Sequence, residues 1–158
     1  MAAIRLRKNQ RIELLRDVQL FSGCSTAELG RIASLTTEHL VKAGQVLTER
    51  GDPGLEFFVI IDGKAKATRK GVHLATLGPG SFFGELALLD CGKRTATVVA
   101  ETDMRLLVLS RREFNGLDHA APSVSRKMLV ELGSRLRTAD EKLDPAPAFG
   151  KRVGPWSL

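Results

Sequence analysis

The chain lacks the residue patterns of a disulfide scaffold, a metal centre or a membrane protein. It has two cysteines, Cys24 and Cys91, in 158 residues, too few for a disulfide framework. Its three histidines, His39, His73 and His119, lie far apart and show no paired spacing of metal ligands. No stretch approaches the roughly 18 apolar residues of a membrane helix, and no signal-peptide core begins the chain. We therefore expect a cytoplasmic protein with reduced thiols, without a metal and without a membrane partner.

Catalytic motifs are also missing. No serine or cysteine has a general base within a recognisable motif, and the Gly-x4-Gly-Lys-Ser/Thr loop of nucleoside triphosphate enzymes does not occur. We therefore do not expect an enzyme. The net charge of +6 favours an anionic partner, but it does not choose among a small anion, a nucleic acid and an acidic membrane surface.

The residues that are present predict an α+β protein in which helices flank a β region. Apolar spacing predicts a helix over residues 4–18, and Ser25 with Glu28 forms a capping-box pattern that predicts a second helix over Thr26–Leu35. Between residues 38 and 110, short runs of β-forming residues alternate with turn signals. This spacing favours a double-stranded β-helix, or jelly roll.

Within the β region, Asp62-Gly63 and Lys70-Gly71 are interpreted as hairpin turns on either side of a strand over Lys64–Arg69. In that strand alanines alternate with polar residues, which predicts one inward and one outward face. Glu101-Thr102-Asp103 is interpreted as a further hairpin turn.

Two helices are predicted after the β region. Ser110 and Glu113 form another capping box, which begins a helix that ends near Leu117. The last helix is predicted over Val124–Leu143, with one apolar stripe. Residues 1–143 would then form one domain, with helices over about 4–35, the roll over about 38–110 and helices over about 111–143. Residues 144–158 are expected to be a flexible tail.

The stretch from Gly84 to Val98 combines groups that suit an anion. Gly84 allows close backbone approach because it has no Cβ. The first amides of a helix predicted over Gly84–Leu89 would direct unsatisfied N–H groups at the anion. Arg94 follows at the start of a predicted strand, and its planar guanidinium can bind two phosphate oxygens at once. Glu85 suits such a site as an acceptor for sugar hydroxyls.

The sequence Phe-Phe-Gly-Glu-Leu-Ala-Leu-Leu, followed by Arg-Thr-Ala-Thr-Val, closely resembles the phosphate-binding cassette of cyclic nucleotide-binding domains. These domains are the ligand-binding modules of cAMP receptor proteins, kinase regulatory subunits and gated channels. The resemblance covers about Leu20 to Leu136. It implies that Glu85 binds the ribose 2′-hydroxyl and that Arg94 binds the cyclic phosphate. The remaining ligand-binding positions that it implies are Gly84, Leu86, Ala87 and Ala96.

Thr95 is a further candidate contact, because a threonine at this position in similar domains can touch the phosphate or the amino group of guanine. Strict strand alternation places Arg94 and Thr95 on opposite faces. Both can reach one ligand only if the chain bends or bulges where the strand begins.

The residue that covers the base is left open by the sequence. The candidates are Leu129, Leu132 and Leu136 on the last helix and Phe149 and Trp156 in the tail. Two positions depart from the family pattern: Leu55 stands where an acidic residue is frequent, and Lys93 stands where proline is frequent.

These features favour a regulatory module that senses a cyclic nucleotide as a ligand and not as a cofactor. The resemblance to the family implies cAMP in preference to cGMP. The tail is too short for a helix-turn-helix, so we expect no DNA-binding domain and an unidentified effector protein as partner. The stripe of the last helix could support a homodimer. Less favoured alternatives are a nucleic-acid-binding protein and a protein scaffold with a vestigial pocket.

Overall fold

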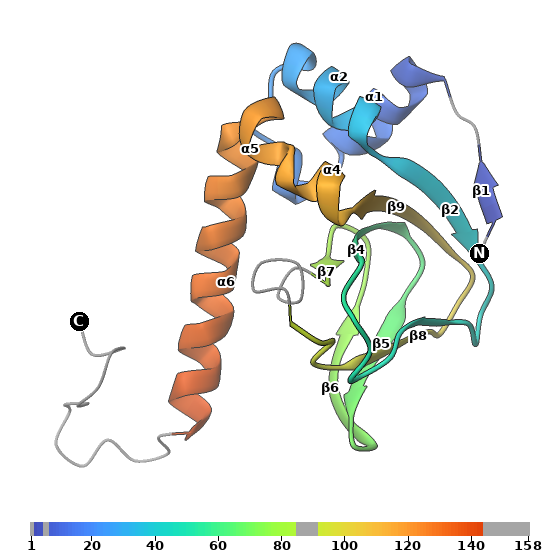
Figure 1. The fold of residues 1–158 in the computed structure, drawn as a ribbon, viewed down its shortest axis with the longest axis vertical. Coiled ribbons are helices and arrows are strands. Elements are labelled where there is room, and N and C mark those ends of the chain that lie inside the picture. Colours follow the sequence, from blue (N-terminus) through green and yellow to red (C-terminus); the bar gives the residue numbers. More distant parts are fainter. Residues whose placement is uncertain (1, 5–6, 85–91, 144–158) are drawn as a thin grey trace, which may run out of the picture. The chain divides into compact units, whose positions relative to one another are not determined.

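The computed structural model describes residues 2–4, 7–84 and 92–143 (Figure 1). The chain divides into two units, the first ending at Ser125 and the second beginning at Arg126. The helices are α1 (Lys8–Arg16), the 3-10 helix η1 (Gln19–Phe21), α2 (Thr26–Leu35), α4 (Arg111–Asn115), α5 (Leu117–Ala120) and α6 (Pro122–Leu143). The strands are β1 (Ala2–Ile4), β2 (Thr37–Val41), β3 (Val46–Thr48), β4 (Glu56–Asp62), β5 (Ala65–Arg69), β6 (Val72–Leu77), β7 (Phe82–Phe83), β8 (Thr97–Ala100) and β9 (Met104–Ser110).

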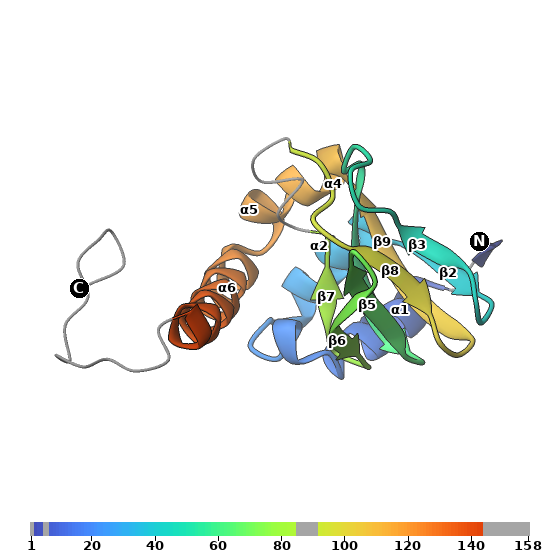
Figure 2. The ribbon, with the colours of Figure 1, turned by 90° about the horizontal axis from the view of Figure 1, so that it is seen from below.

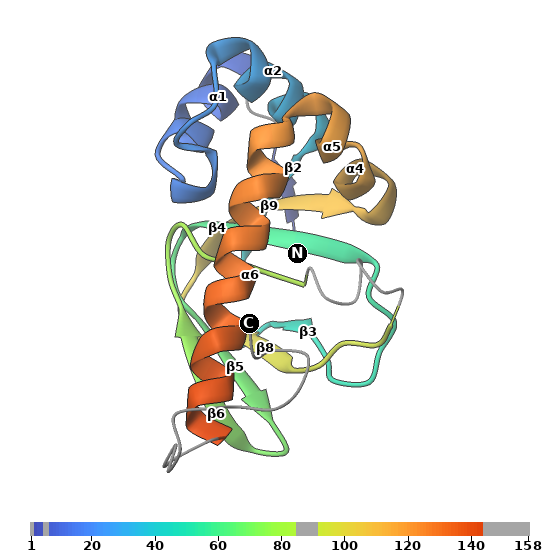
Figure 3. The same cartoon turned by 90° about the vertical axis from the view of Figure 1, so that its left-hand side faces the viewer.

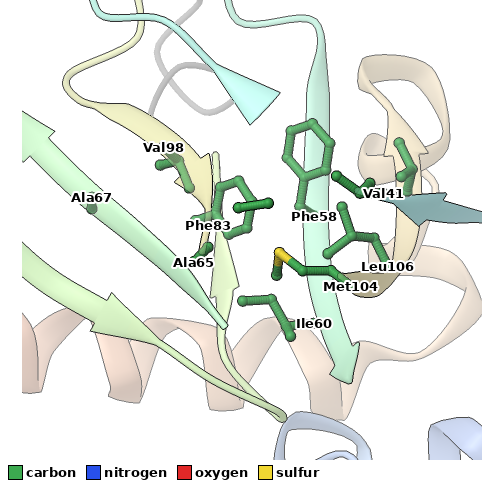
Figure 4. Close-up of a cluster of buried hydrophobic side chains, with 11 residues drawn as sticks. Val41, Phe58, Ile60, Ala65, Ala67, Phe83, Val98, Met104 and Leu106 are labelled. Atoms are coloured by element: carbon green, nitrogen blue, oxygen red, sulfur yellow. The ribbon is translucent and has the colours of Figure 1, made fainter. Parts of the chain in front are cut away.

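Two antiparallel sheets form the roll (Figures 1 and 2). The five-stranded sheet has the order β1-β2-β9-β4-β7, and the four-stranded sheet has the order β3-β8-β5-β6. Figure 4 shows Phe58 and Ile60 of the first sheet in one buried cluster with Ala65, Ala67 and Val98 of the second. The jelly roll predicted from the sequence, with helices before and after it, is therefore confirmed.

Two of the three predicted hairpin turns are wrong. Asp62-Gly63 leads from β4 in the five-stranded sheet to β5 in the four-stranded sheet, and residues 101–103 lead from β8 back to β9. These two corners bind each other, because the Lys64 N–H donates to Thr102 Oγ1 at 2.9 Å and Lys64 O accepts from the Glu101 N–H at 2.9 Å. Turn residues show that the chain changes direction, but they do not show which sheet receives the next strand.

Strand β5 and the hairpin that follows it confirm the prediction. Ala65 and Ala67 are buried, whereas Lys66 between them is exposed. Lys70 and Gly71 connect β5 to β6 with φ angles of 51° and 77°, the left-handed region that tight hairpins need.

Both predicted capping boxes are present. Ser25 Oγ accepts from the Glu28 N–H at 3.1 Å, and the Glu28 carboxylate accepts from the Ser25 N–H at 3.1 Å. Ser110 and Glu113 exchange the same pair of bonds at 3.3 and 2.8 Å. Helices α2 and α4 therefore begin where the sequence predicted, because each first turn is satisfied locally.

The helix predicted over residues 4–18 is shorter, spanning Lys8–Arg16. Residues 2–4 instead form β1, which pairs with β2 and places Ala3 opposite His39. Three residues are too few for a periodic signal, so pairing with an edge strand decides their conformation.

The last helix, α6, has 22 residues and begins at Pro122, two residues before the predicted start. Proline suits a first helical position because its missing N–H would have no partner there. No helix among the described residues is long and apolar enough to cross a membrane. The predicted tail, residues 144–158, lies outside the described residues.

Helices α1, α2, α4 and α5 gather at one end of the roll (Figures 1 and 3). The ring of Phe57 in β4 lies 5.0 Å from the ring of Phe114 in α4 and 5.7 Å from that of Phe82 in β7. Tilted aromatic pairs of this kind contribute about 0.5–1.5 kcal/mol beyond area burial. Helix α4 thus packs directly on β4, close to the first residue of that strand, Glu56.

Arg11 joins α1 to the end of α2 and to β2. Its Nη1 donates to Ala33 O at 2.8 Å and to Thr36 O at 3.1 Å, and its Nε lies 3.4 Å from the Glu38 carboxylate. The Glu38 side chain is fully buried. This burial raises the pKa of Glu38, while the charges of Arg11 and Arg105 oppose the rise.

We predict that Arg11→Ala lowers the free energy of unfolding at pH 7 by about 2–4 kcal/mol, because Glu38 stays buried without this counter-ion. The loss should shrink as the pH falls through the raised pKa of Glu38, since the folded variant then binds a proton that the unfolded chain does not. Urea unfolding at pH 5 and pH 7 measures both effects.

Arg16→Ala on the same helix is the matched control. The Arg16 side chain is 45% exposed and its partner Glu13 is 72% exposed, so this pair should contribute less than about 1 kcal/mol. Equal losses in the two variants would contradict the role given to Arg11.

Candidate anion-binding site

The structure describes four of the predicted binding residues, Gly84, Arg94, Thr95 and Ala96. The other three, Glu85, Leu86 and Ala87, lie outside the described residues, as does the helix predicted to begin at Gly84.

Arg94 is directed into the roll and is only 8% exposed. Its Nη1 donates to Gly84 O at 3.0 Å and its Nη2 donates to Glu56 O at 2.6 Å. The guanidinium carbon lies 5.8 Å from the centre of the Phe58 ring. Gly84 follows β7 and Glu56 begins β4, and both strands belong to the five-stranded sheet. The Arg94 side chain therefore reaches this sheet from the segment that precedes β8 of the four-stranded sheet.

Gly84 is required at its position for two reasons. Its φ is +94°, in the left-handed region that favours glycine. A Cβ added there would also lie 2.6 Å from Arg94 Nη1 and 2.8 Å from Glu56 O. The absent side chain of Gly84 therefore leaves the space that the guanidinium occupies.

The strand predicted to open at Arg94 begins later. Strand β8 starts at Thr97, and residues 95 and 96 form a bend. The sequence analysis required a bend here, because Arg94 and Thr95 would otherwise lie on opposite faces of a strand and could not both contact one ligand. Arg94 is buried and Thr95 is exposed, so the two side chains differ in their access to solvent.

The backbone carbonyls of residues 94, 95 and 96 all accept hydrogen bonds from the protein. In that order the donors are Gly51 N–H, Arg69 Nε and Thr48 Oγ1, at 3.0, 3.0 and 3.1 Å. The C=O and N–H of one trans peptide point in opposite directions. The Ala96 N–H, which shares its peptide with Thr95 O, therefore points away from the Arg69 guanidinium, an arrangement that suits an anion on that side.

Residues 51–56 connect this site to helix α4. They contact Arg94 through Gly51 and Glu56, as described above. At the other end of the loop, the Arg111 N–H donates to Leu55 O at 3.1 Å, and Arg111 Nη2 donates to Gly54 O at 2.6 Å. A shift of this loop would therefore change the hydrogen bonds of Arg111, the first residue of α4.

Sequence reasoning missed the contributions of Glu56, Arg69 and Arg111. Glu56 contributes a backbone carbonyl, which leaves no trace in residue type. Arg69 lies two residues after Ala67 in β5. Because side chains alternate between the faces of a strand, the sequence could have placed Arg69 on the same inner face as the buried Ala65 and Ala67. Leu55 stands where the family often has an acidic residue, and its side chain is 64% exposed. The contact to Arg111 is made by the Leu55 backbone carbonyl, which does not depend on the residue type.

Comparison with known proteins gives a consistent result. The family model for the cyclic nucleotide-binding domain matches residues 38–119. A cyclic AMP receptor protein from Thermus thermophilus is 35% identical over 130 residues, which is 79% of this chain and 60% of that protein. A cyclic nucleotide-gated potassium channel from Rhizobium etli is 34% identical over 122 residues, which is 75% of this chain and 34% of the channel.

Solved structures share the fold. The catabolite activator protein of Thermus thermophilus superposes with a TM-score of 0.73 at 36% identity, covering 79% of this chain and 61% of that one. The regulatory subunit of a cAMP-independent protein kinase A from Trypanosoma brucei gives 0.72 at 23% identity, covering 81% and 46%. The chain thus spans 60% of the length of the receptor protein and less of the channel.

We predict that Gly84→Ala is more destabilising than Gly80→Ala. Gly80 has a similar φ of +87°, but nothing lies within 4 Å of an added Cβ, so its substitution should cost only about 1–2 kcal/mol for the backbone. Gly84→Ala should cost about 1–3 kcal/mol more, because the added Cβ clashes with Arg94 Nη1 and with Glu56 O and disturbs the hydrogen bonds that the guanidinium makes there. Denaturant unfolding of the two variants measures the difference, and equal losses would show that the guanidinium does not need this space.

Proposed function

The chain belongs to the cyclic nucleotide-binding domain family, and we propose that it is a regulatory module that binds a cyclic nucleotide, preferably cAMP. The observation that supports this most directly is the buried guanidinium of Arg94, fixed beside Gly84 and next to a bend whose carbonyls are already satisfied. The ligand would be bound and released unchanged, without turnover.

In this proposal Arg94 binds the cyclic phosphate. The Ala96 amide donates to the same phosphate, and Thr95 is a further contact. Glu85 accepts from the ribose 2′-hydroxyl, and the Gly84, Leu86 and Ala87 positions complete the cradle. The roles of Glu85, Leu86 and Ala87 rest on the family resemblance, because these residues lie outside the described part of the chain.

The preference for cAMP rests on the relatives and not on a described base contact. One relative is named as a cyclic AMP receptor protein. A protein with the same fold is named as part of a cAMP-independent kinase, so the fold alone does not choose the ligand. Both cAMP and cGMP therefore belong in the test.

We propose that the response to ligand starts in residues 51–56. A phosphate bound to Arg94 would compete with Glu56 O for the guanidinium, and the loop would then transmit the change through Gly54 and Leu55 to Arg111. The ligand can drive this shift only by its higher affinity for the shifted state. An effector protein would recognise the changed α4 and the helices that follow it.

We predict that saturating cAMP, at about 100 times its Kd, raises the free energy of unfolding by about 2.7 kcal/mol. Arg94→Ala should abolish this gain, because the phosphate loses its charged donor. Thermal unfolding with cAMP, cGMP and linear AMP measures the effect and the order of preference.

Lys66→Ala is the matched control, since it removes one positive charge from an exposed position on β5. It should keep the full gain with cAMP. An equal gain with linear AMP would indicate general phosphate binding. No gain with any nucleotide would favour the scaffold with a vestigial pocket, and steeply salt-dependent binding of nucleic acid would favour the nucleic-acid alternative.

We predict that cAMP changes the hydrogen exchange of α4 amides, and that Arg111→Ala reduces this change while cAMP still binds. The reason is that Arg111 connects the start of α4 to Gly54 and Leu55. Arg112→Ala, at the exposed neighbouring position, should preserve the response. The route through residues 51–56 is wrong if Arg111→Ala leaves the α4 response intact.

A further inference from the structure

Arg69 is a second arginine beside the candidate site, and strand geometry places it on the inner side of the four-stranded sheet. Successive strand residues point to opposite faces, so Arg69 shares the face of Ala65 and Ala67. The last paired residues of β5 and β8 are Thr68 and Thr97. One step further along the antiparallel pair brings Arg69 level with Ala96.

The Arg69 side chain makes one hydrogen bond among the described residues, from its Nε to Thr95 O at 3.0 Å. This carbonyl belongs to the same peptide as the Ala96 N–H. The peptide is planar, so a bond that fixes the direction of the C=O also fixes the direction of the N–H. Ala96 precedes β8, and its N–H makes none of the loop or side-chain hydrogen bonds of the described residues.

The opposite end of residue 96 is fixed as well, because Ala96 O accepts from Thr48 Oγ1 at 3.1 Å. The Ala96 amide thus lies between two anchored carbonyls within a bend that has left the strand ladder. A charged donor on Thr95 O also polarises the peptide, since hydrogen bonds in series strengthen one another. The result is a better and less mobile N–H donor.

We propose that Arg69 is a positioning residue for nucleotide binding, which holds the Thr95–Ala96 peptide so that the Ala96 N–H is directed at the ligand phosphate. This inference rests on the proposed function. Arg69 acts through the peptide and not through the phosphate. This positioning role gives a reason for an exposed arginine at the end of β5, where the two preceding inward residues are both alanine.

The test compares Arg69→Ala, Arg69→Lys and Lys66→Ala in the full chain, with cAMP as the probe. Lys66→Ala removes the same charge from the same strand on the opposite face. We expect Arg69→Ala to raise the Kd about three- to tenfold, which corresponds to the typical net contribution of one hydrogen bond. Lys66→Ala should change the Kd less than about twofold, and Arg69→Lys, which keeps a charged donor, should recover much of the lost affinity.

A spectroscopic measurement separates positioning from general destabilisation. In the wild type and in Lys66→Ala, cAMP should move the Ala96 amide proton downfield in a 1H–15N spectrum, as a hydrogen bond to phosphate forms. In Arg69→Ala at saturating cAMP, this shift should be smaller. Loss of thermal stability without cAMP, combined with an unchanged Ala96 shift, would show a purely structural role and overturn the inference.

The outcomes also separate this inference from the function on which it rests. Unchanged cAMP affinity in Arg69→Ala, with normal binding by the wild type, overturns the role of Arg69 alone. If the wild type binds neither cAMP nor cGMP, the proposed function fails, and the role of Arg69 fails with it.

Discussion

The two hydrogen bonds from the Arg94 guanidinium to Gly84 O and Glu56 O are the constraint around which the site is arranged. They hold a permanent cation at an almost fully buried position, where low polarity strengthens its interactions. They also connect the segment before β8 to the first residue of β4 and to the residue that follows the edge strand β7. The missing side chain of Gly84 makes this contact sterically possible. A phosphate can use the same guanidinium only by adding to these bonds or by exchanging with them.

The jelly-roll topology brings these parts together. The chain passes from one sheet to the other between β3 and β4 and again between β7 and β8, and residues 51–56 run beside the bend before β8. Residues separated by about forty positions in the sequence are therefore neighbours at the site. The same loop contacts Arg111, so the proposed ligand site and the start of α4 share one piece of backbone. A regulatory module needs such a shared element, because its ligand must favour one of two arrangements.

Much of the fold could be predicted from local patterns. The capping boxes at Ser25 and Ser110 fixed two helix starts, and the alternation in β5 fixed its faces, because in each case neighbouring residues supply the interaction. The errors arose where distant pairing decides the outcome. Residues 2–4 became a strand through the edge of β2, and two corner turns joined different sheets where hairpins were predicted. Strand β8 began three residues late, because the bend at residues 95–96 is held by donors from other segments.

By itself, the sequence determined the family and singled out Arg94 as the candidate phosphate ligand, because the cassette is a continuous run of unusual composition. The tertiary structure alone decided which backbone atoms surround Arg94 and which arginine anchors the next peptide. Carbonyl groups are the same in every residue, so the choice of Glu56, Gly84 and Thr95 as acceptors leaves no mark in the residue types. That choice follows from how the two sheets pack, since packing sets which backbone lies within reach of a guanidinium.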